Sequence, residues 1–233
     1  MATPPLLVAE DLLLLLLDDE RGTPPSGVPV DTVLGGAVLV ELASGGHVAV
    51  AEQTSRWRAA KVRATGTTPP PSDPVLAEAL TTVAAKEREA SDLVDRLGKG
   101  LRSRLADRLV DRGVLEREDE KVLGLFSRTR WPAADREHEA AVRERLQAVL
   151  VDGAEPDERT VAIAALLHAV SRAEKTVDRG DVPAREVRRR AKDLAEGTWG
   201  AEAVGDAIAA VTLATTTAVL AASTAAVAAG GSS

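Results

Sequence analysis

The sequence predicts an all-α protein: a central helical bundle wrapped by amphipathic helices, with one small β-hairpin. Two observations predict this fold. Residues 12–17 are six consecutive leucines, and aromatic residues make up only 2% of the 233 residues. The core must therefore be filled by Leu, Val, Ala and Ile, which suits helix packing better than a β-sandwich.

The leucine run lies between Glu10-Asp11 and Asp18-Asp19-Glu20. It places apolar side chains on every side of a helix, so this helix must be buried and the others must pack around it. The run is far shorter than the roughly 20 apolar residues that cross a bilayer. The carboxylates at 18–20 also suit a metal or acid–base site. Because such residues are mostly solvated, we expect no metal there.

Composition limits the function. A chain with 45% hydrophobic and 28% charged residues is typical of a folded soluble protein. We expect a single domain over residues 1–233, with flexible ends at 1–5 and 229–233. The absence of cysteine excludes disulfides and thiolate metal sites. The net charge of −7 argues against general nucleic-acid affinity. The N-terminus lacks the features of a secretory signal, so we expect a cytoplasmic protein.

After a turn at residues 22–27, Asp31 is expected to cap a helix over residues 32–43, which Ser-Gly-Gly ends. Residues 47–50 alternate weakly and predict a short strand. A loop rich in Pro, Gly and Thr is expected over residues 65–74.

Residues 54–63 hold four positive charges and no acidic residue. Two interpretations stay open for this segment. It is either a solvated edge strand over residues 56–63, kept soluble by its charge, or a contact with an anionic surface through Arg56, Trp57 and Arg58.

One amphipathic helix is expected over residues 74–97, and a second over residues 101–112. Leu101, Leu105 and Leu109 form the core stripe of the second helix, and Gly113 ends it at the C′ position. From Arg96 to Arg112 there are six basic and two acidic residues, a local excess of 6 − 2 = +4 in an acidic chain.

Residues 114–132 predict the hairpin, with a charged tip and an apolar return strand. Its apolar residues, Leu125 and Phe126 among them, either belong to the core or insert into a membrane. Further helices are expected at 135–152, 156–173 and 182–196. From residue 207 onward no side chain is charged, and we favour a packed final helix over a membrane span because Ala and Thr contribute little to insertion.

No catalytic constellation is visible. His47, His138 and His168 fall on three separate elements, without the spacing of metal ligands. His168 lies in an apolar helix and is expected to be a core histidine. Phosphate-loop, dinucleotide and nucleophile-elbow motifs are also absent from the sequence. We therefore expect neither catalysis nor a cofactor.

Several segments, taken in order, resemble the Golgi phosphoprotein 3 family and its actinobacterial members. The matching segments are Ala9–Gly22, Leu34–Leu42, Arg102–Leu115, Phe126 with its hairpin, and Pro156–Ala169. The resemblance covers about residues 6–215. It implies an all-α fold with one hairpin and a non-enzymatic role in peripheral binding to phosphatidylinositol 4-phosphate. In eukaryotic members it also implies a bridge to the cytoplasmic tails of glycosyltransferases.

The resemblance also implies a headgroup pocket. Two family arginines correspond to Lys99 and Arg102, which keep the charge. A family tryptophan and a third arginine correspond to Ser26 and Gly35. These two replacements remove a planar wall and a bidentate phosphate clamp, and Lys99 is a point charge where an arginine is a fork.

Our leading hypothesis is a non-catalytic peripheral membrane adaptor that binds anionic phospholipid or phosphoinositide headgroups through Lys99 and Arg102, at the inner face of the plasma membrane. Cytoplasmic tails of membrane enzymes are further partners that the resemblance implies. One alternative is a winged-helix-like nucleic-acid binder that uses Arg102, Arg104 and Arg108 on phosphates. Another is a protein–protein scaffold that self-associates through the hairpin.

Overall fold

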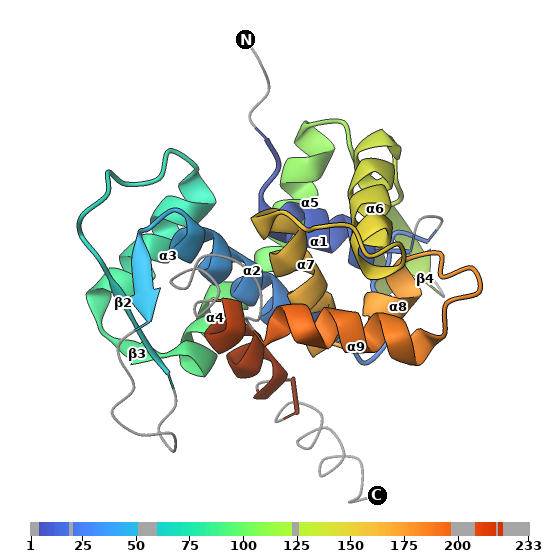
Figure 1. The fold of residues 1–233 in the computed structure, drawn as a ribbon. Coiled ribbons are helices and arrows are strands. Elements are labelled where there is room, and N and C mark those ends of the chain that lie inside the picture. Colours follow the sequence, from blue (N-terminus) through green and yellow to red (C-terminus); the bar gives the residue numbers. More distant parts are fainter. Residues whose placement is uncertain are drawn as a thin grey trace, which may run out of the picture.

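The computed structural model describes residues 5–18, 21–50, 60–122, 126–196, 208–217 and 219–220, with the backbone alone at 120–122 and 126–128. The protein is mostly helical, with small antiparallel sheets, which confirms the predicted fold class. Figure 1 shows helices gathered around a short central helix, with a small sheet at one side. The ends expected to be flexible lie outside the described residues, apart from Pro5.

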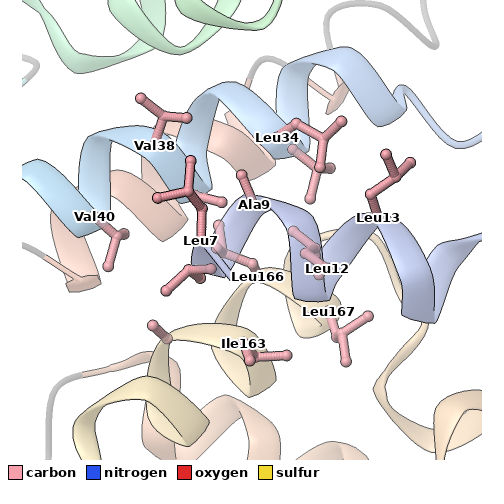
Figure 2. Close-up of a cluster of buried hydrophobic side chains, with 14 of the residues drawn as sticks. Leu7, Ala9, Leu12, Leu13, Leu34, Val38, Val40, Ile163, Leu166 and Leu167 are labelled. Atoms are coloured by element: carbon pink, nitrogen blue, oxygen red, sulfur yellow. The ribbon is translucent and has the colours of Figure 1, made fainter. Parts of the chain in front are cut away.

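The central helix is α1, Val8–Leu16, and every one of its residues is buried. Figure 2 shows α1 between α2, which contributes Leu34 and Val38, and α7, which contributes Ile163, Leu166 and Leu167. Burying one leucine side chain stabilises the fold by about 1.5–3 kcal/mol. The six leucines therefore make α1 the core of the molecule, as predicted.

Helix α2, Val30–Ser44, crosses α4, Ala90–Gly98, at two glycines. A Cβ on Gly35 would lie 2.0 Å from the carbonyl oxygen of Val94, and one on Gly98 would lie 2.1 Å from that of Asp31. Such distances are far inside van der Waals contact, so only glycine lets the two backbones approach this closely.

Three short strands form a sheet in the order β1-β2-β3: Val48–Val50, Lys61–Ala64 and Arg88–Glu89. Strand β2 is antiparallel to both neighbours, and Val62 is its buried residue. The edge-strand interpretation is therefore wrong for residues 61–64, which form the middle strand. The expected strand at 47–50 is confirmed.

The single helix expected over residues 74–97 is two helices, α3 (Pro74–Ala85) and α4, separated by β3. Lys86 is extended and ends α3, and Arg88 and Glu89 pair with β2. Residues 86–89 are all charged, so their apolar pattern gives no sign of this break. The pairing with β2, which is distant in sequence, decides it.

Helix α5, Leu101–Asp111, ends before Gly113 (φ +73°) as expected, and Leu101, Leu105 and Leu109 are buried. The hairpin follows as β4, Glu118–Val122, and β5, Phe126–Arg130. Residues 118 and 130 pair across it, as do 120 and 128, and both pairs join an acidic residue to an arginine. The charge therefore runs along both strands, so the predicted apolar return strand is wrong. The tip, residues 123–125, lies outside the described residues.

The remaining helices cover the other side of α1: α6 (Glu137–Leu150), α7 (Glu158–Ala169), α8 (Ala173–Thr176) and α9 (Ala184–Ala195). The helix expected to reach residue 173 ends earlier, because Ser171 adopts φ +55°. The final helical segment, 208–217, buries Ile208 and Val211. No helix in the described part of the chain combines the length and apolar character needed to cross a membrane.

The crossing of α2 and α4 gives a first prediction. Gly35→Ala adds a methyl group against the backbone of α4, and we expect it to destabilise the fold by about 2 kcal/mol or more. A helix normally gains about 1 kcal/mol from this substitution, so the clash reverses the usual sign. Urea unfolding measures the change.

Ser44→Ala is the control, because Ser44 is exposed at the end of the same helix. We expect it to change stability by less than about 0.5 kcal/mol. A Gly35→Ala protein as stable as the parent would show that the two backbones do not meet at this glycine.

Candidate anion-binding site

Lys99 and Arg102 lie where α4 gives way to α5. Lys99 follows the buried Gly98 and is exposed, and Arg102 is half-buried in the first turn of α5. Within the described residues neither side chain has an ion pair, and the buried Nε of Arg102 has no hydrogen-bond partner. The two cations that the family resemblance selected therefore lie three residues apart with their charges unmatched.

Asp31 occupies the N-terminus of α5 rather than that of α2. Its Oδ1 accepts a hydrogen bond from the backbone N–H of Arg102 (3.0 Å), and α2 begins one residue earlier, at Val30. The prediction that Asp31 caps α2 is wrong. A carboxylate at a helix N-terminus is favoured by the helix dipole, and Asp31 already satisfies one amide that a bound anion would otherwise find free.

The other basic residues of this stretch are neutralised. Each of the other four arginines pairs with a carboxylate that precedes residue 96. The pairs are Arg96 with Asp92, Arg104 with Glu78, Arg108 with Asp73 and Glu10, and Arg112 with Glu10. Four arginines thus meet four carboxylates. The +4 excess seen in the sequence is reduced at the surface to Lys99 and Arg102.

Glu10 is the carboxylate that draws α5 onto α1. It is 0% exposed and accepts a hydrogen bond from the backbone N–H of Leu7 (2.7 Å). Arg108 Nε lies 3.0 Å from Glu10 Oε1, and Arg112 Nη1 lies 3.7 Å from Glu10 Oε2. Burial raises the pKa of Glu10, and the Leu7 N–H and the two arginines act against that rise.

Asp11, also 0% exposed, makes the corresponding contacts on the other side of α1. Its Oδ2 accepts from Arg159 Nε of α7 (2.8 Å), and its Oδ1 lies 2.7 Å from His138 Nε2 of α6. The sequence showed Glu10 and Asp11 only as the acidic flank of the leucine run. Their burial follows from that of the whole helix, because its first turn cannot reach solvent.

Glu41 of α2 completes this cluster. Its Oε2 accepts a hydrogen bond from the backbone N–H of Val8 (2.9 Å), and its Oε1 lies 4.0 Å from Arg159 Nη1. Burial raises its pKa from 4.5 to about 7, against the opposing effects of that hydrogen bond and of Arg159. Asp73 behaves differently: its hydrogen bonds with Arg108 and with backbone amides outweigh burial and lower its pKa.

The structure places Ser26 and Gly35, the other two predicted headgroup contacts, in different surroundings from Lys99 and Arg102. Gly35 is buried in the crossing of α2 and α4, where it has no surface to offer a ligand. Ser26 is exposed and lines a hollow of about 400 Å³ together with Arg21 and Arg130.

The predicted membrane contacts Arg56, Trp57, Arg58 and Leu125 lie outside the described residues. Phe126 is described by its backbone, which begins β5 and pairs with Val122. These residues stay predictions.

His168 lies half-buried on α7, and burial, with Lys192 nearby, lowers its pKa. Within the described residues, no group of three or more His, Asp or Glu side chains is arranged to hold a metal ion. Glu10 and Asp11 instead face arginines, whose charges offset part of the cost of burying these carboxylates.

The family model of Golgi phosphoprotein 3 (GPP34) matches residues 8–211. The chain belongs to the Golgi phosphoprotein 3 family. This match begins with α1 and extends into the final helical segment, so it covers nearly all of the described fold. The family is one of adaptors without enzymatic activity. No curated protein matches the chain.

The raised pKa of Glu41 gives a second prediction. Between pH 4.5 and about 7 the folded protein holds more protons at this site than the unfolded chain, so stability falls as the pH rises through this interval. Glu41→Gln is neutral at every pH and removes that fall. At pH 8 we expect the variant to be more stable by about 3 kcal/mol, and near pH 4 to equal the parent.

Urea unfolding of both proteins across this pH range measures the difference. Glu116→Gln, at an exposed position, controls for the substitution itself. A constant difference between Glu41→Gln and the parent at all pH values would contradict the prediction.

Proposed function

We propose that this chain is a non-enzymatic peripheral adaptor that meets anionic phosphoinositide-like headgroups through Lys99 and Arg102, at the cytoplasmic face of a membrane. Family membership supports the adaptor role. The observation that supports these two residues is that neither has an ion pair within the described residues. The other arginines between residues 96 and 112 each pair with a carboxylate.

The strength of such binding follows from the number of free charges. A lysine or arginine near an anionic leaflet contributes about 1 kcal/mol, so Lys99 and Arg102 together contribute about 2 kcal/mol. This attraction is weak and is screened by salt over about 8–10 Å. Lys99 supplies a point charge and Arg102 a fork, so Arg102 is the residue that can hold a phosphate through two parallel hydrogen bonds.

The same ion pairs weigh against the nucleic-acid alternative. Arg104 and Arg108, two of the three arginines assigned there to phosphates, are held by Glu78 and by Asp73 and Glu10. A recognition helix needs its basic side chains free to reach phosphates and base edges. Here only Arg102 of the three has no ion pair among the described residues.

Vesicle flotation tests the proposal. Vesicles of phosphatidylcholine alone are compared with vesicles that also contain phosphatidylglycerol or phosphatidylinositol 4-phosphate. We expect recovery only with the anionic vesicles, and loss of that recovery between about 50 and 500 mM salt. The double variant Lys99→Glu/Arg102→Glu should weaken binding by about 30-fold or more, the equivalent of two cationic contacts.

Arg185→Glu/Lys192→Glu is the matched control. It replaces the same residue types on exposed positions of α9 and changes the net charge by the same amount. Equal loss of binding in both variants would attribute adsorption to net charge alone. Absence of the parent protein from anionic vesicles at low salt would refute the proposal.

Two partners remain predictions of the family resemblance. Binding to cytoplasmic tails of membrane enzymes needs a candidate tail and is tested by affinity measurement on a synthetic peptide. Self-association through β4 and β5 is tested by light scattering of the purified chain.

A further inference from the structure

A second cationic place lies at the C-terminal end of α1. A hollow of about 490 Å³ opens there, lined by the last leucines of α1, by Asp18, Arg21 and Pro25 after it, and by Arg143, Arg172 and Lys175. Arg143 comes from α6 and Lys175 from α8, which Figure 1 places beside this end of α1. We call it the α1-end hollow. Neither Lys99 nor Arg102 lines it.

The lining is strongly positive for an acidic protein. It holds four cations and one carboxylate, a local excess of 4 − 1 = +3 against a net charge of −7 for the chain. Arg143 is already engaged by the carbonyl oxygen of Thr176 (2.9 Å) and by Glu139. The side chains of Arg21, Arg172 and Lys175 have no hydrogen bond or ion pair to any described residue.

Arg21 is held in position by its backbone. Its N–H donates to Asp18 Oδ1 (2.7 Å), and the N–H of Gly22 donates to the carbonyl oxygen of Asp18 (2.7 Å). Gly22 adopts φ +56° and lies so close to Trp131 that a Cβ would be 2.1 Å from its backbone. Gly22 is therefore fixed against the buried Trp131, which anchors the backbone directly after Arg21.

Arg172 and Lys175 are positioned by the turn between α7 and α8. Ser171 adopts φ +55°, a conformation that few residues other than glycine take up. Two backbone hydrogen bonds fix the turn: the N–H of Ser171 donates to the carbonyl oxygen of His168 (2.9 Å), and the N–H of Arg172 donates to that of Leu167 (2.8 Å). Arg172 and Lys175 are three residues apart across the start of α8, so they face the same side.

We propose that the α1-end hollow binds a phosphate group, a phosphomonoester or a diphosphate, through Arg21, Arg172 and Lys175. Two guanidinium forks and one ammonium supply the planar and point-charge donors that phosphate oxygens accept. The volume holds more than a phosphate ion, which leaves room for the molecule that carries it. This site is additional to the one at Lys99 and Arg102.

The probe is inorganic pyrophosphate, and binding is followed by calorimetry and by chemical shifts of the labelled full-length chain. Arg172→Gln/Lys175→Gln removes two charges and keeps side-chain length. We expect affinity for pyrophosphate to fall by about tenfold or more. Arg185→Gln/Lys192→Gln, with the same residue types at exposed positions of α9, should leave it unchanged.

Three results would overturn the proposal: no binding of pyrophosphate by the parent, unchanged binding by Arg172→Gln/Lys175→Gln, or equal affinity for tetraglutamate. The competing explanation is that these cations only offset the negative end of the α1 dipole. The double variant would then lose stability and keep its affinity. Should that variant fail to fold, Arg21→Gln and Lys175→Gln, both at exposed positions, each provide the same comparison.

Vesicles of phosphatidylcholine with phosphatidic acid identify the source of the phosphate. A loss of vesicle recovery in Arg172→Gln/Lys175→Gln assigns it to a lipid headgroup. Unchanged recovery together with lost pyrophosphate binding assigns it to a soluble molecule. Because Lys99 and Arg102 remain intact in this variant, the outcome is separate from that of the adaptor proposal.

Discussion

The ion pairs at the first turn of α1 are the constraint on which the fold depends. A helix that is apolar on all sides must be covered everywhere, and covering it takes Glu10 and Asp11 out of water as well. An ionised group in the interior costs several kcal/mol unless it is paired. Their side-chain partners come from three helices: Arg108 of α5 with Arg112 at its C-terminal end, His138 of α6, and Arg159 of α7. One buried turn thereby fixes where three helices meet.

This constraint also explains the surface charge. The C-terminal half of α5 is basic because it serves carboxylates inside the protein, so its arginines are unavailable to a partner. Lys99 and Arg102, at the other end of α5, have no such task within the described residues. The sequence shows six basic residues between Arg96 and Arg112, but four of them pair with carboxylates, three of these with partners distant in sequence.

The sequence was informative wherever local pattern decides structure. The leucine run predicted the buried helix, Gly113 the end of α5, and alternation the strand at 48–50. Prediction from the sequence failed where a contact with a segment distant in the sequence decides the local structure. Residues 88–89 were expected within a helix but pair with β2. Asp31 lies in α2, but its carboxylate accepts a hydrogen bond from the first turn of α5. Gly35 marks a helix crossing that no local pattern shows. The hollow beside α1 gathers residues from positions 15 to 175, so composition gave no hint of it.

The two cationic places differ in the electrostatics that they offer to an anion. Lys99 is exposed and its field decays over a Debye length of about 8–10 Å, which suits an extended charged surface. In a chain with a net charge of −7 most of the molecule is repelled by such a surface. The adsorption proposed through Lys99 and Arg102 therefore needs the α4–α5 junction to face the membrane. The hollow is concave, and its half-buried Arg172 is less screened. Directional bonds there select one phosphate group rather than a sheet of charge.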